Sequence, residues 1–359
     1  MTRLILICLS ALVLAISAEE VDEMQVTRLL HDSSNKFTSR MFNEVALANE
    51  GKSFVLSAFS VMPPLGQLAL ASVGESHDEL LNNLDIPNDN MTIAVFSYSN
   101  ALIQSVEDVT LKMAGKLFIA KNYKINKNFG EVSRNAFQSE FQNIDFDHKE
   151  AAANEINQWV EAQTNNKIKD LVDPNSISGA TRAILANAIY FKGNWKDQFS
   201  KYATQERDFH VSKDKKNKVQ MMNRKGHYNY VESSDLNAQV LEIPYKGDQL
   251  SLVVALPRDI DGLHALEEKL KDPSALDKAI NSMSNIEVDV FLPKFKIETK
   301  TELKEVLQKM GINKLFTAGQ ARLDNLLEGE NDLYVDSAVQ KAFIEVNEEG
   351  TEAAAANAF

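Results

Sequence analysis

The sequence predicts an α+β fold in which helices pack on large sheets within one domain. Helical patterns dominate the first third of the 359 residues, and strand patterns dominate the remainder without a regular strand–helix alternation. No linker rich in Pro, Gly or Ser divides the chain, and no repeat of fixed period is visible. Hydrophobic residues make up 44% of the chain, which supplies a sizeable core and excludes wholesale disorder.

The first part of the chain carries mainly helical signals. Apolar residues recur at every fourth position, as on one face of a helix, at Phe37, Met41 and Val45. Residues 53–61, SFVLSAFSV, predict a strand, and Pro63-Pro64 suits the first turn of a helix after it. Residues 74–81, GESHDELL, predict another short helix. Residues 108–120 alternate between apolar and polar side chains, which predicts a strand.

Strand patterns become more frequent in the rest of the chain. Residues 150–166 predict a helix with one apolar side, which holds Ile156, Trp159 and Val160. Residues 181–195 predict a strand covered on both faces, because the sequence there shows little alternation. Residues 300–312 predict a helix that Gly311 closes. The other strand patterns are 208–257 with several strands, 286–299 with two strands or one long bent strand, and 333–350 with the last long strand.

Residues 1–18 have the pattern of a secretory signal peptide. Arg3 precedes an apolar stretch that is too short to span a bilayer, and small residues follow where signal peptidase would cleave. A membrane anchor is the alternative. Cys8 is the only cysteine, so the mature chain, residues 19–359, would be a secreted, extracellular domain that core packing stabilises without disulfides.

The charge of the chain bears on its partners. A net charge of −13 argues against nucleic acid, anionic membranes and heparin-like polyanions as partners. The basic stretch 212–218, SKDKKNK, is a local exception that we interpret as a solvated loop. An N-x-T sequon at Asn90 makes this residue a candidate glycosylation site.

The sequence carries no signature of a common enzyme class. It has no Gly-rich dinucleotide fingerprint, phosphate-binding loop, G-x-S-x-G elbow or H-E-x-x-H pair. The acid pairs Glu267-Glu268 and Glu348-Glu349 are interpreted as solvated surface charge. The histidines are scattered, at positions 31, 77, 148, 210, 227 and 264. We therefore expect no enzymatic activity, no metal site and no cofactor.

The chain ends on the unusual stretch IEVNEEGTEAAAANAF. Alternate residues of a strand face opposite sides. One face of this tail would hold Thr351, Ala353, Ala355, Asn357 and Phe359, and the other would hold Glu352, Ala354, Ala356 and Ala358. Such a segment fits a narrow gap between two strands, with Gly350 as a pivot because glycine adopts backbone angles that other residues avoid. A disordered or weakly helical alanine-rich end is the alternative.

Four segments of the chain resemble signatures of the serpin family, and the likeness runs from the first helix to the last residue. The segments are NAIYFKGNW at 187–195, FLPKFKIET at 291–299, QKAFIEV at 340–346 and VNEEGTEAAAA at 346–356. The sequence resembles moth haemolymph serpins of the alaserpin type. The resemblance implies one serpin-like domain with helices on large, mainly antiparallel sheets.

The resemblance also implies a function. Serpins trap serine proteases: the protease cuts an exposed loop and stays acylated, and the loop then inserts as a new strand into a large sheet. The partners would be serine proteases, the full-length protein would be a monomer, and neither a cofactor nor heparin is expected. A non-inhibitory carrier or extracellular binding protein is the alternative, although such relatives carry bulky or charged hinge residues.

Individual residues carry over by their place in these motifs. The hinge of the reactive loop would be Glu348, Glu349, Gly350, Thr351, Glu352, Ala353, Ala354, Ala355 and Ala356. The shutter, a polar cluster under the opening sheet, would be Ser57, Ser60, Asn187 and Gln340. Trp195 would lie at the top of the sheet, in the breach where insertion begins. Most members have His at position 340, and Gln does not titrate near neutral pH.

The resemblance finally predicts where the chain stops relative to the family. Phe359 falls within the reactive loop, short of the scissile bond. The residue that sets protease specificity and the C-terminal strands of the sheets would then lie beyond this chain. The chain would be the constant part of a gene with alternative last exons, a processed fragment or an incomplete sequence.

Overall fold

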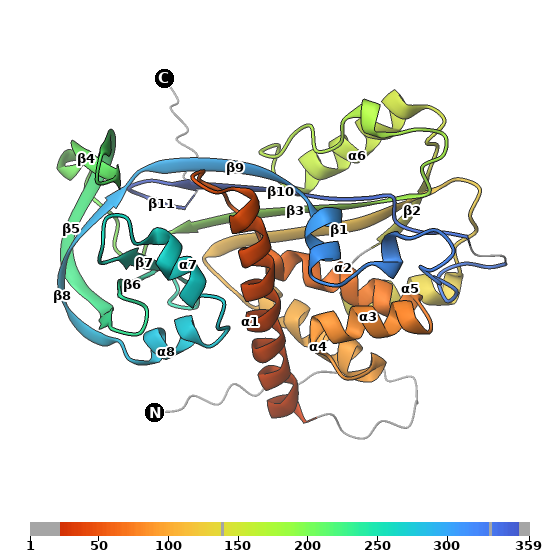
Figure 1. Ribbon diagram of the computed structural model, residues 1–359, viewed down its shortest axis with the longest axis horizontal. Coiled ribbons are helices and arrows are strands. Elements are labelled where there is room, and N and C mark those ends of the chain that lie inside the picture. The colour runs from red at the N-terminus through yellow and green to blue at the C-terminus, as the bar shows by residue number, and fades with distance from the viewer. Residues whose placement is uncertain (1–21, 138–139, 330–331, 352–359) are drawn as a thin grey trace.

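The computed structural model describes residues 22–137, 140–329 and 332–351, which form an α+β fold with two sheets (Figure 1). The larger sheet has the strand order β2 (Glu140–Ile144), β1 (Val109–Ala120), β3 (Ala183–Asn194), β11 (Gly350–Thr351), β10 (Ser337–Val346) and β9 (Phe295–Glu302). The smaller sheet has the order β4 (Gln205–Ser212), β5 (Lys215–Ser233), β6 (Ala238–Pro244) and β7 (Ser251–Pro257), and β8 (Ser284–Pro293) pairs with β5. The predicted fold class is confirmed.

The described strands pair mainly antiparallel. The exceptions are the parallel pairs β1–β2 and β3–β10. Strand β10 runs beside β3 only from Ser337 to Ala342 and then diverges from it. The short strand β11 lies between the two strands at this diverging end, antiparallel to both. Strands β3 and β10 are therefore paired directly at the start of β10 and lie apart at its end, which is called the open end of the sheet below.

Helices cover both faces of the larger sheet (Figure 1). Helix α6 (Lys149–Gln163) lies on one face, and α2 to α5 lie on the other. The remaining bounds are α1 Glu23–Ala48, α2 Ala58–Ala71, α3 Glu75–Leu84, α4 Asp89–Gln104, α5 Lys127–Phe137, α7 Leu263–Lys269, α8 Ala275–Asn281 and α9 Leu303–Lys309. The predicted helices in 74–81, 150–166 and 300–312 are confirmed, and Gly311 follows α9 with a φ of 104°.

One predicted strand is wrong. Residues 53–57 form no strand, and α2 begins at Ala58 because the Ser57 side chain caps it, accepting a hydrogen bond from the Ser60 amide at 3.2 Å. Pro63 and Pro64 consequently lie in the second turn of α2 instead of its first. The error has a physical origin: α2 is buried almost all round, so its sequence lacks the polar face by which a helix is told from a buried strand.

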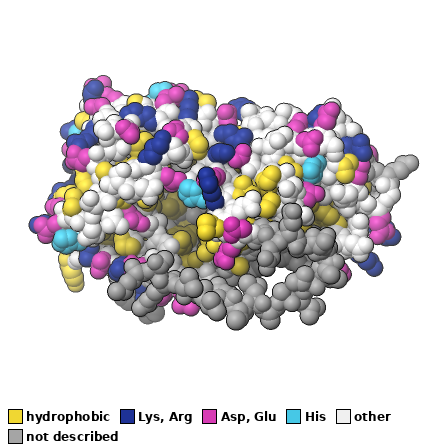
Figure 2. Space-filling view, turned by 90° about the horizontal axis from the view of Figure 1, so that it is seen from below, with side chains coloured by type: hydrophobic (Ala, Val, Ile, Leu, Met, Phe, Trp, Pro, Cys, Tyr) yellow, Lys and Arg dark blue, Asp and Glu magenta, His cyan; other side chains and the backbone are white. Residues whose placement is uncertain are grey.

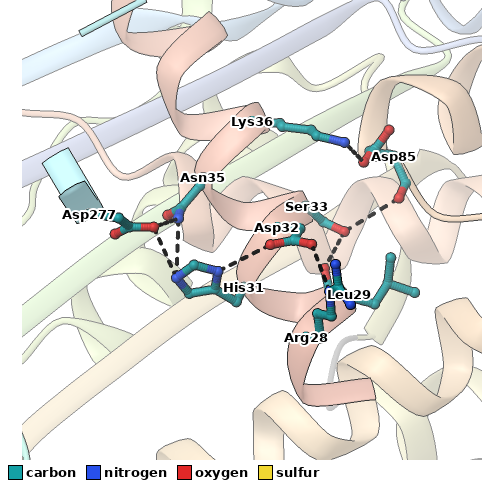
Figure 3. A network of polar contacts seen from close by, with 9 residues as sticks. All are labelled: Arg28, Leu29, His31, Asp32, Ser33, Asn35, Lys36, Asp85 and Asp277. Atoms are coloured by element: carbon teal, nitrogen blue, oxygen red, sulfur yellow. Dashed lines mark hydrogen bonds and ion pairs between the residues drawn. The ribbon is translucent and has the colours of Figure 1, made fainter. Parts of the chain in front are cut away.

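Polar contacts fix α1 against distant elements (Figure 3). His31 Nε2 lies 3.1 Å from Asp277 Oδ2 on α8, and Asn35 Nδ2 donates to the same oxygen at 2.6 Å. Lys36 forms an ion pair with Asp85, which follows α3. Phe37, Met41 and Val45 of α1 are buried, as their spacing predicts. Helix α1 is therefore linked both to α8 and to the segment that follows α3.

The last predicted strand, 333–350, is interrupted. Strand β10 ends at Val346 and residues 347–349 turn the chain back. The Asn347 side chain makes this turn, because its Oδ1 accepts hydrogen bonds from the amides of Glu349 at 2.9 Å and Gly350 at 3.3 Å. The tail therefore returns along β10 instead of continuing it.

Candidate functional site

The four residues predicted to form the shutter meet in one hydrogen-bonded cluster beneath the larger sheet. Asn187 on β3 and Gln340 on β10 are paired across the parallel ladder. The Gln340 Nε2 atom lies 2.7 Å from Asn187 Oδ1 and 2.8 Å from the Ser57 carbonyl oxygen. The Ser60 hydroxyl donates to Asn187 Oδ1 at 2.9 Å. The cluster joins the start of α2 to the two strands that must separate if the sheet opens.

Gln340 forms hydrogen bonds in this buried cluster through both the oxygen and the nitrogen of its side-chain amide. Its Oε1 accepts a hydrogen bond from the Ser57 amide at 3.0 Å, while its Nε2 donates. Gln340 is fully buried and Asn187 is 1% exposed, so each needs a partner inside the protein. An amide has a donor and an acceptor at any pH, which makes this junction independent of protonation near neutrality.

The start of the tail is already docked in the open end of the sheet. Thr351 pairs with Gly193 of β3 on one side and with Val346 of β10 on the other. Its side chain is 1% exposed, and its Oγ1 lies 2.5 Å from the hydroxyl oxygen of Tyr245. The hydroxyl of Thr351 is thus held on the inner face of the sheet.

An aromatic group supports the docked residue. The Trp195 ring stacks on Tyr245 with centroids 4.8 Å apart, and Phe191 meets Tyr245 edge-on at 5.0 Å. Trp195 Nε1 donates to the Asn347 carbonyl oxygen at 2.9 Å, which attaches the ring to the turn before the tail. Burial raises the pKa of Tyr245 to about 12, so its hydroxyl keeps its proton at physiological pH.

Tyr245 is a residue of this site that the sequence did not reveal. It lies in the connection after β6, more than a hundred positions before Thr351, and no motif marks it. Its neighbour Gly193 provides the necessary space, since a Cβ atom there would lie 2.9 Å from the tyrosine ring. Tyr245 and Thr351 come together only through the tertiary arrangement of β3 and the β6–β7 connection.

The structure gives a reason for glycine at position 350 that the sequence did not reveal. Its φ is not among the positive values of the described glycines. A Cβ atom on Gly350 would instead lie 2.0 Å from the Gly193 carbonyl oxygen, so the two backbones meet too closely for any side chain. The pivot role proposed for Gly350 stays a prediction.

Comparison with known proteins identifies the family. The family model "Serpin (serine protease inhibitor)" matches residues 32–359. Alaserpin of Manduca sexta is 56% identical over 355 residues, covering 99% of this chain and 90% of its own length, and antitrypsin of Bombyx mori is 53% identical over 354 residues, covering 99% of this chain and 89% of its own. The structure of Serpin48 from Tenebrio molitor has a TM-score of 0.85 at 32% identity, covering 92% of this chain and 90% of that one.

The chain belongs to the serpin family. These relatives bear names of protease inhibitors, and the family is one of inhibitors instead of catalysts. Within the described part of this serpin, no three or more His, Cys, Asp or Glu side chains are grouped to hold a metal ion. None of its described helices has the length and hydrophobicity that a membrane span requires.

The turn before the tail of this serpin is held by two ion pairs of different exposure. The Glu348 side chain, 6% exposed, lies 2.8 Å from Lys294 Nζ and accepts a hydrogen bond from the Thr204 hydroxyl at 2.7 Å. Glu349 pairs with Lys201 at 2.6 Å, but both side chains face solvent, at 38% and 67% exposure. Burial alone would raise the pKa of Glu348, but these hydrogen bonds outweigh it and lower the pKa. The prediction that Glu348 is solvated surface charge is wrong, because tertiary contacts bury it.

The stabilisation by Glu348 should depend on pH. Its pKa in the folded protein lies below the ordinary 4.5, so its contribution is complete above that value and is lost as the pH falls through the folded pKa. We expect Glu348→Gln to lower the urea midpoint at pH 7 and to differ less from the unsubstituted protein below about pH 4. An equal difference at both pH values would contradict this assignment.

Three predictions about this serpin remain outside what the structure tests. Asn90 is exposed near the start of α4, and the sequon's Thr92 hydroxyl donates to the Asn88 carbonyl oxygen at 2.9 Å. Glycosylation of Asn90 remains a prediction. The hinge residues Glu352 and 353–356 lie outside the described residues, as does the predicted signal peptide.

Proposed function

We propose that this serpin is a secreted inhibitor that traps serine proteases on its own cleaved tail. The observation that carries the proposal is the double pairing of Thr351, which places the first tail residues between β3 and β10. Beyond this point the tail is rich in alanine, whose small side chains meet little resistance in a narrow slot. The hinge, the shutter and Trp195 are the parts that would move.

The proposed reaction begins at a scissile bond that the family resemblance puts beyond Phe359. The serine hydroxyl of the protease attacks the carbonyl carbon of this bond, the new amine leaves, and the tail remains attached to the protease as an ester. The freed tail then extends β11 between β3 and β10, toward Asn187 and Gln340. The protease is carried along and distorted before water hydrolyses the ester.

The resting sheet is open only beside the docked residue, where insertion would begin. No backbone pairing joins residues 190–192 of β3 to residues 343–345 of β10 in the described part of the chain. A full strand would satisfy these edges and add backbone hydrogen bonds, each worth on the order of 1 kcal/mol. The shutter contact between Asn187 and Gln340 opposes insertion, because it must break. Uncleaved protein is then metastable and relaxes only after the tail is cut.

The test uses this chain continued past Phe359 by the corresponding C-terminal segment of Manduca sexta alaserpin, called the extended protein below. It is incubated with trypsin-like, chymotrypsin-like and elastase-like proteases, and the products are separated in SDS. We expect a complex of serpin and protease that resists SDS with at least one protease. Clean cleavage with all of them would favour a carrier or binding protein.

Heparin should not accelerate the inhibition. Helix α3 and the start of α4 carry the acidic residues Glu75, Asp78, Glu79 and Asp89, and acidic side chains are interspersed with basic ones on the face shown in Figure 2. Basic residues of the stretch 212–218 are partly neutralised, as Lys213 and Lys218 pair with Asp261 and Asp208.

The measurement is the association rate of the extended protein with its protease at increasing heparin concentration. A flat response is expected at physiological salt. A rise in rate with heparin would contradict the prediction, and substitution of Lys213 and Lys218 by Gln would then show whether the β4–β5 turn is responsible.

A further inference from the structure

The histidine of α3 lies between two carboxylates from different helices. His77, in the first turn of α3, has its Nε2 atom 2.8 Å from Asp89 Oδ1 and its Nδ1 atom 3.3 Å from Asp78 Oδ1. Asp78 is its neighbour on α3, whereas Asp89 is the first residue of α4. The His77 side chain is 23% exposed, so the protein partly shields these contacts from water. His77 is therefore a polar link between the beginnings of the two helices.

Both contacts together require the protonated ring. A neutral imidazole has a proton on one nitrogen only, and its other nitrogen is an acceptor. Because a carboxylate oxygen lies beside each nitrogen of His77, the neutral ring can donate to one carboxylate and turns a lone pair toward the other. The imidazolium donates to both carboxylates. Loss of the second proton therefore removes one of the two hydrogen bonds.

Other charged groups around α3 are engaged elsewhere. Helix α2, which packs against α3, has no charged side chain, and Asp89 is the only charged residue of α4. On and beside α3, further charged side chains have partners of their own: Glu75 with Lys314, Glu79 with the amides of Asn313 and Lys314, Asp85 with Lys36, and Arg40 with Asn83. Asp78 and Asp89 are therefore the charges that control the protonation of His77.

The balance of these effects favours the imidazolium. Burial alone would lower the pKa of His77, and the positive ends of the two helices also oppose a cation there. The hydrogen bonds with Asp89 and Asp78 outweigh burial and raise the pKa of His77 above the ordinary 6.5. A group whose pKa is raised by folding contributes stability that is complete below its unfolded pKa and is lost as the pH rises through its folded pKa. The contribution of His77 is therefore greatest in mildly acidic solution.

We propose that His77 is a pH-sensitive latch, whose imidazolium joins the start of α3 to the start of α4 in mildly acidic solution and whose deprotonation weakens that link. On deprotonation the proton passes to water, and the ring can no longer donate to Asp78 and Asp89 at once. The latch lies far from β11 and the open end of the sheet (Figure 1). It does not depend on insertion of the tail, so it stands or falls separately from the proposed function.

The first measurement is the titration of His77 itself. In the extended protein, the imidazole proton signals are followed by NMR from about pH 5 to about pH 9, and His77→Gln identifies the signal of His77. Its titration midpoint should lie above 6.5 and should fall in Asp89→Asn, which removes the charge of the carboxylate on α4. A midpoint at or below 6.5, or one that Asp89→Asn leaves unchanged, would overturn the inference.

A double-mutant cycle shows whether the contact joins the two helices. Urea midpoints of His77→Gln, Asp89→Asn and the double variant are measured at about pH 5.5 and about pH 8.5. At the lower pH the double variant should lose much less than the sum of the two single losses, because either substitution breaks the same contact. At the higher pH the loss in His77→Gln should largely disappear.

His227→Gln is the control for the change of pH. His227 is exposed on β5, and the nearby Glu287 pairs with Lys225 instead. This substitution should change the urea midpoint equally at both pH values. Additive losses in the cycle at about pH 5.5, or an equal loss in His77→Gln at both pH values, would contradict the latch.

Discussion

Replacing Thr351 by Arg is expected to turn the extended protein from an inhibitor into a substrate. Thr351 is the first inward-facing residue of the tail and is 1% exposed, with its hydroxyl against Tyr245. An arginine there must be buried in a slot fitted to a hydroxyl and a methyl group, which costs about 3–5 kcal/mol if its charge is unpaired. In the uncut protein the arginine avoids this cost by leaving the slot, but it must enter the slot for the tail to insert. The cost therefore falls on the start of insertion, before later tail residues can form compensating hydrogen bonds.

The outcome is decided by competing rates. Insertion competes with hydrolysis of the acyl-enzyme, and each ~1.4 kcal/mol added to its barrier slows insertion about tenfold. The Thr351→Arg protein should therefore be cleaved and released. Thr351→Ser, which keeps the hydroxyl, should remain inhibitory.

The matched control for this change is Glu352→Arg. If the tail continues as a strand, alternation would turn Glu352, which lies outside the described residues, to the opposite side of the sheet. The measurement is the inhibitor-to-protease ratio needed for complete inhibition. It should rise steeply for Thr351→Arg and stay close to that of the unsubstituted protein for Glu352→Arg. Similar ratios for the two variants would show that the inward face is assigned wrongly.

Reversing the charge of Glu348 should destabilise the open end of the sheet. Glu348→Lys places a second ammonium group beside Lys294 and removes the acceptor of the Thr204 hydroxyl. Because the Glu348 side chain is only 6% exposed, we expect a loss of about 3–5 kcal/mol in the free energy of unfolding. The turn before β11 should loosen too, since the Phe199 amide donates to the Glu348 carbonyl oxygen at 2.9 Å.

Glu349→Lys provides the comparison one residue away. Glu349 and its partner Lys201 are both solvent-exposed, so the loss of their ion pair should change stability little. Urea unfolding followed by tryptophan fluorescence measures both variants, because Trp195 lies against the affected turn. Equal destabilisation by the two substitutions would mean that burial does not distinguish the two glutamates.

The sequence predicted those parts of the molecule whose patterns are local. Period and alternation located α6 and β1, and the absence of alternation in 181–195 correctly indicated that β3 is a strand with both faces covered. The same reasoning failed at α2, where a helix buried all round has no polar face to reveal its period. It also missed the turn at 347–349, which depends on one side-chain oxygen of Asn347.

The sequence predicted several residues of the site but not how they are arranged in space. The family resemblance named Ser57, Ser60, Asn187 and Gln340, and the structure brings all four into contact. Tyr245 carried no signal, because its contact with Thr351 exists only once β3 and the β6–β7 connection are assembled. The requirement for glycine at position 350 likewise arises from a backbone contact with Gly193 that no local pattern encodes.

The central claim is that the cut tail becomes a strand between β3 and β10, and hydrogen exchange tests it most directly. Backbone amides of residues 190–192 and 343–345 are measured in the extended protein before and after cleavage of its reactive segment. These segments have no pairing to each other in the described resting structure. We predict strong new protection of the amides that face the gap after cleavage. Unchanged exchange in both segments of fully cleaved protein would contradict insertion and the inhibitory mechanism proposed from it.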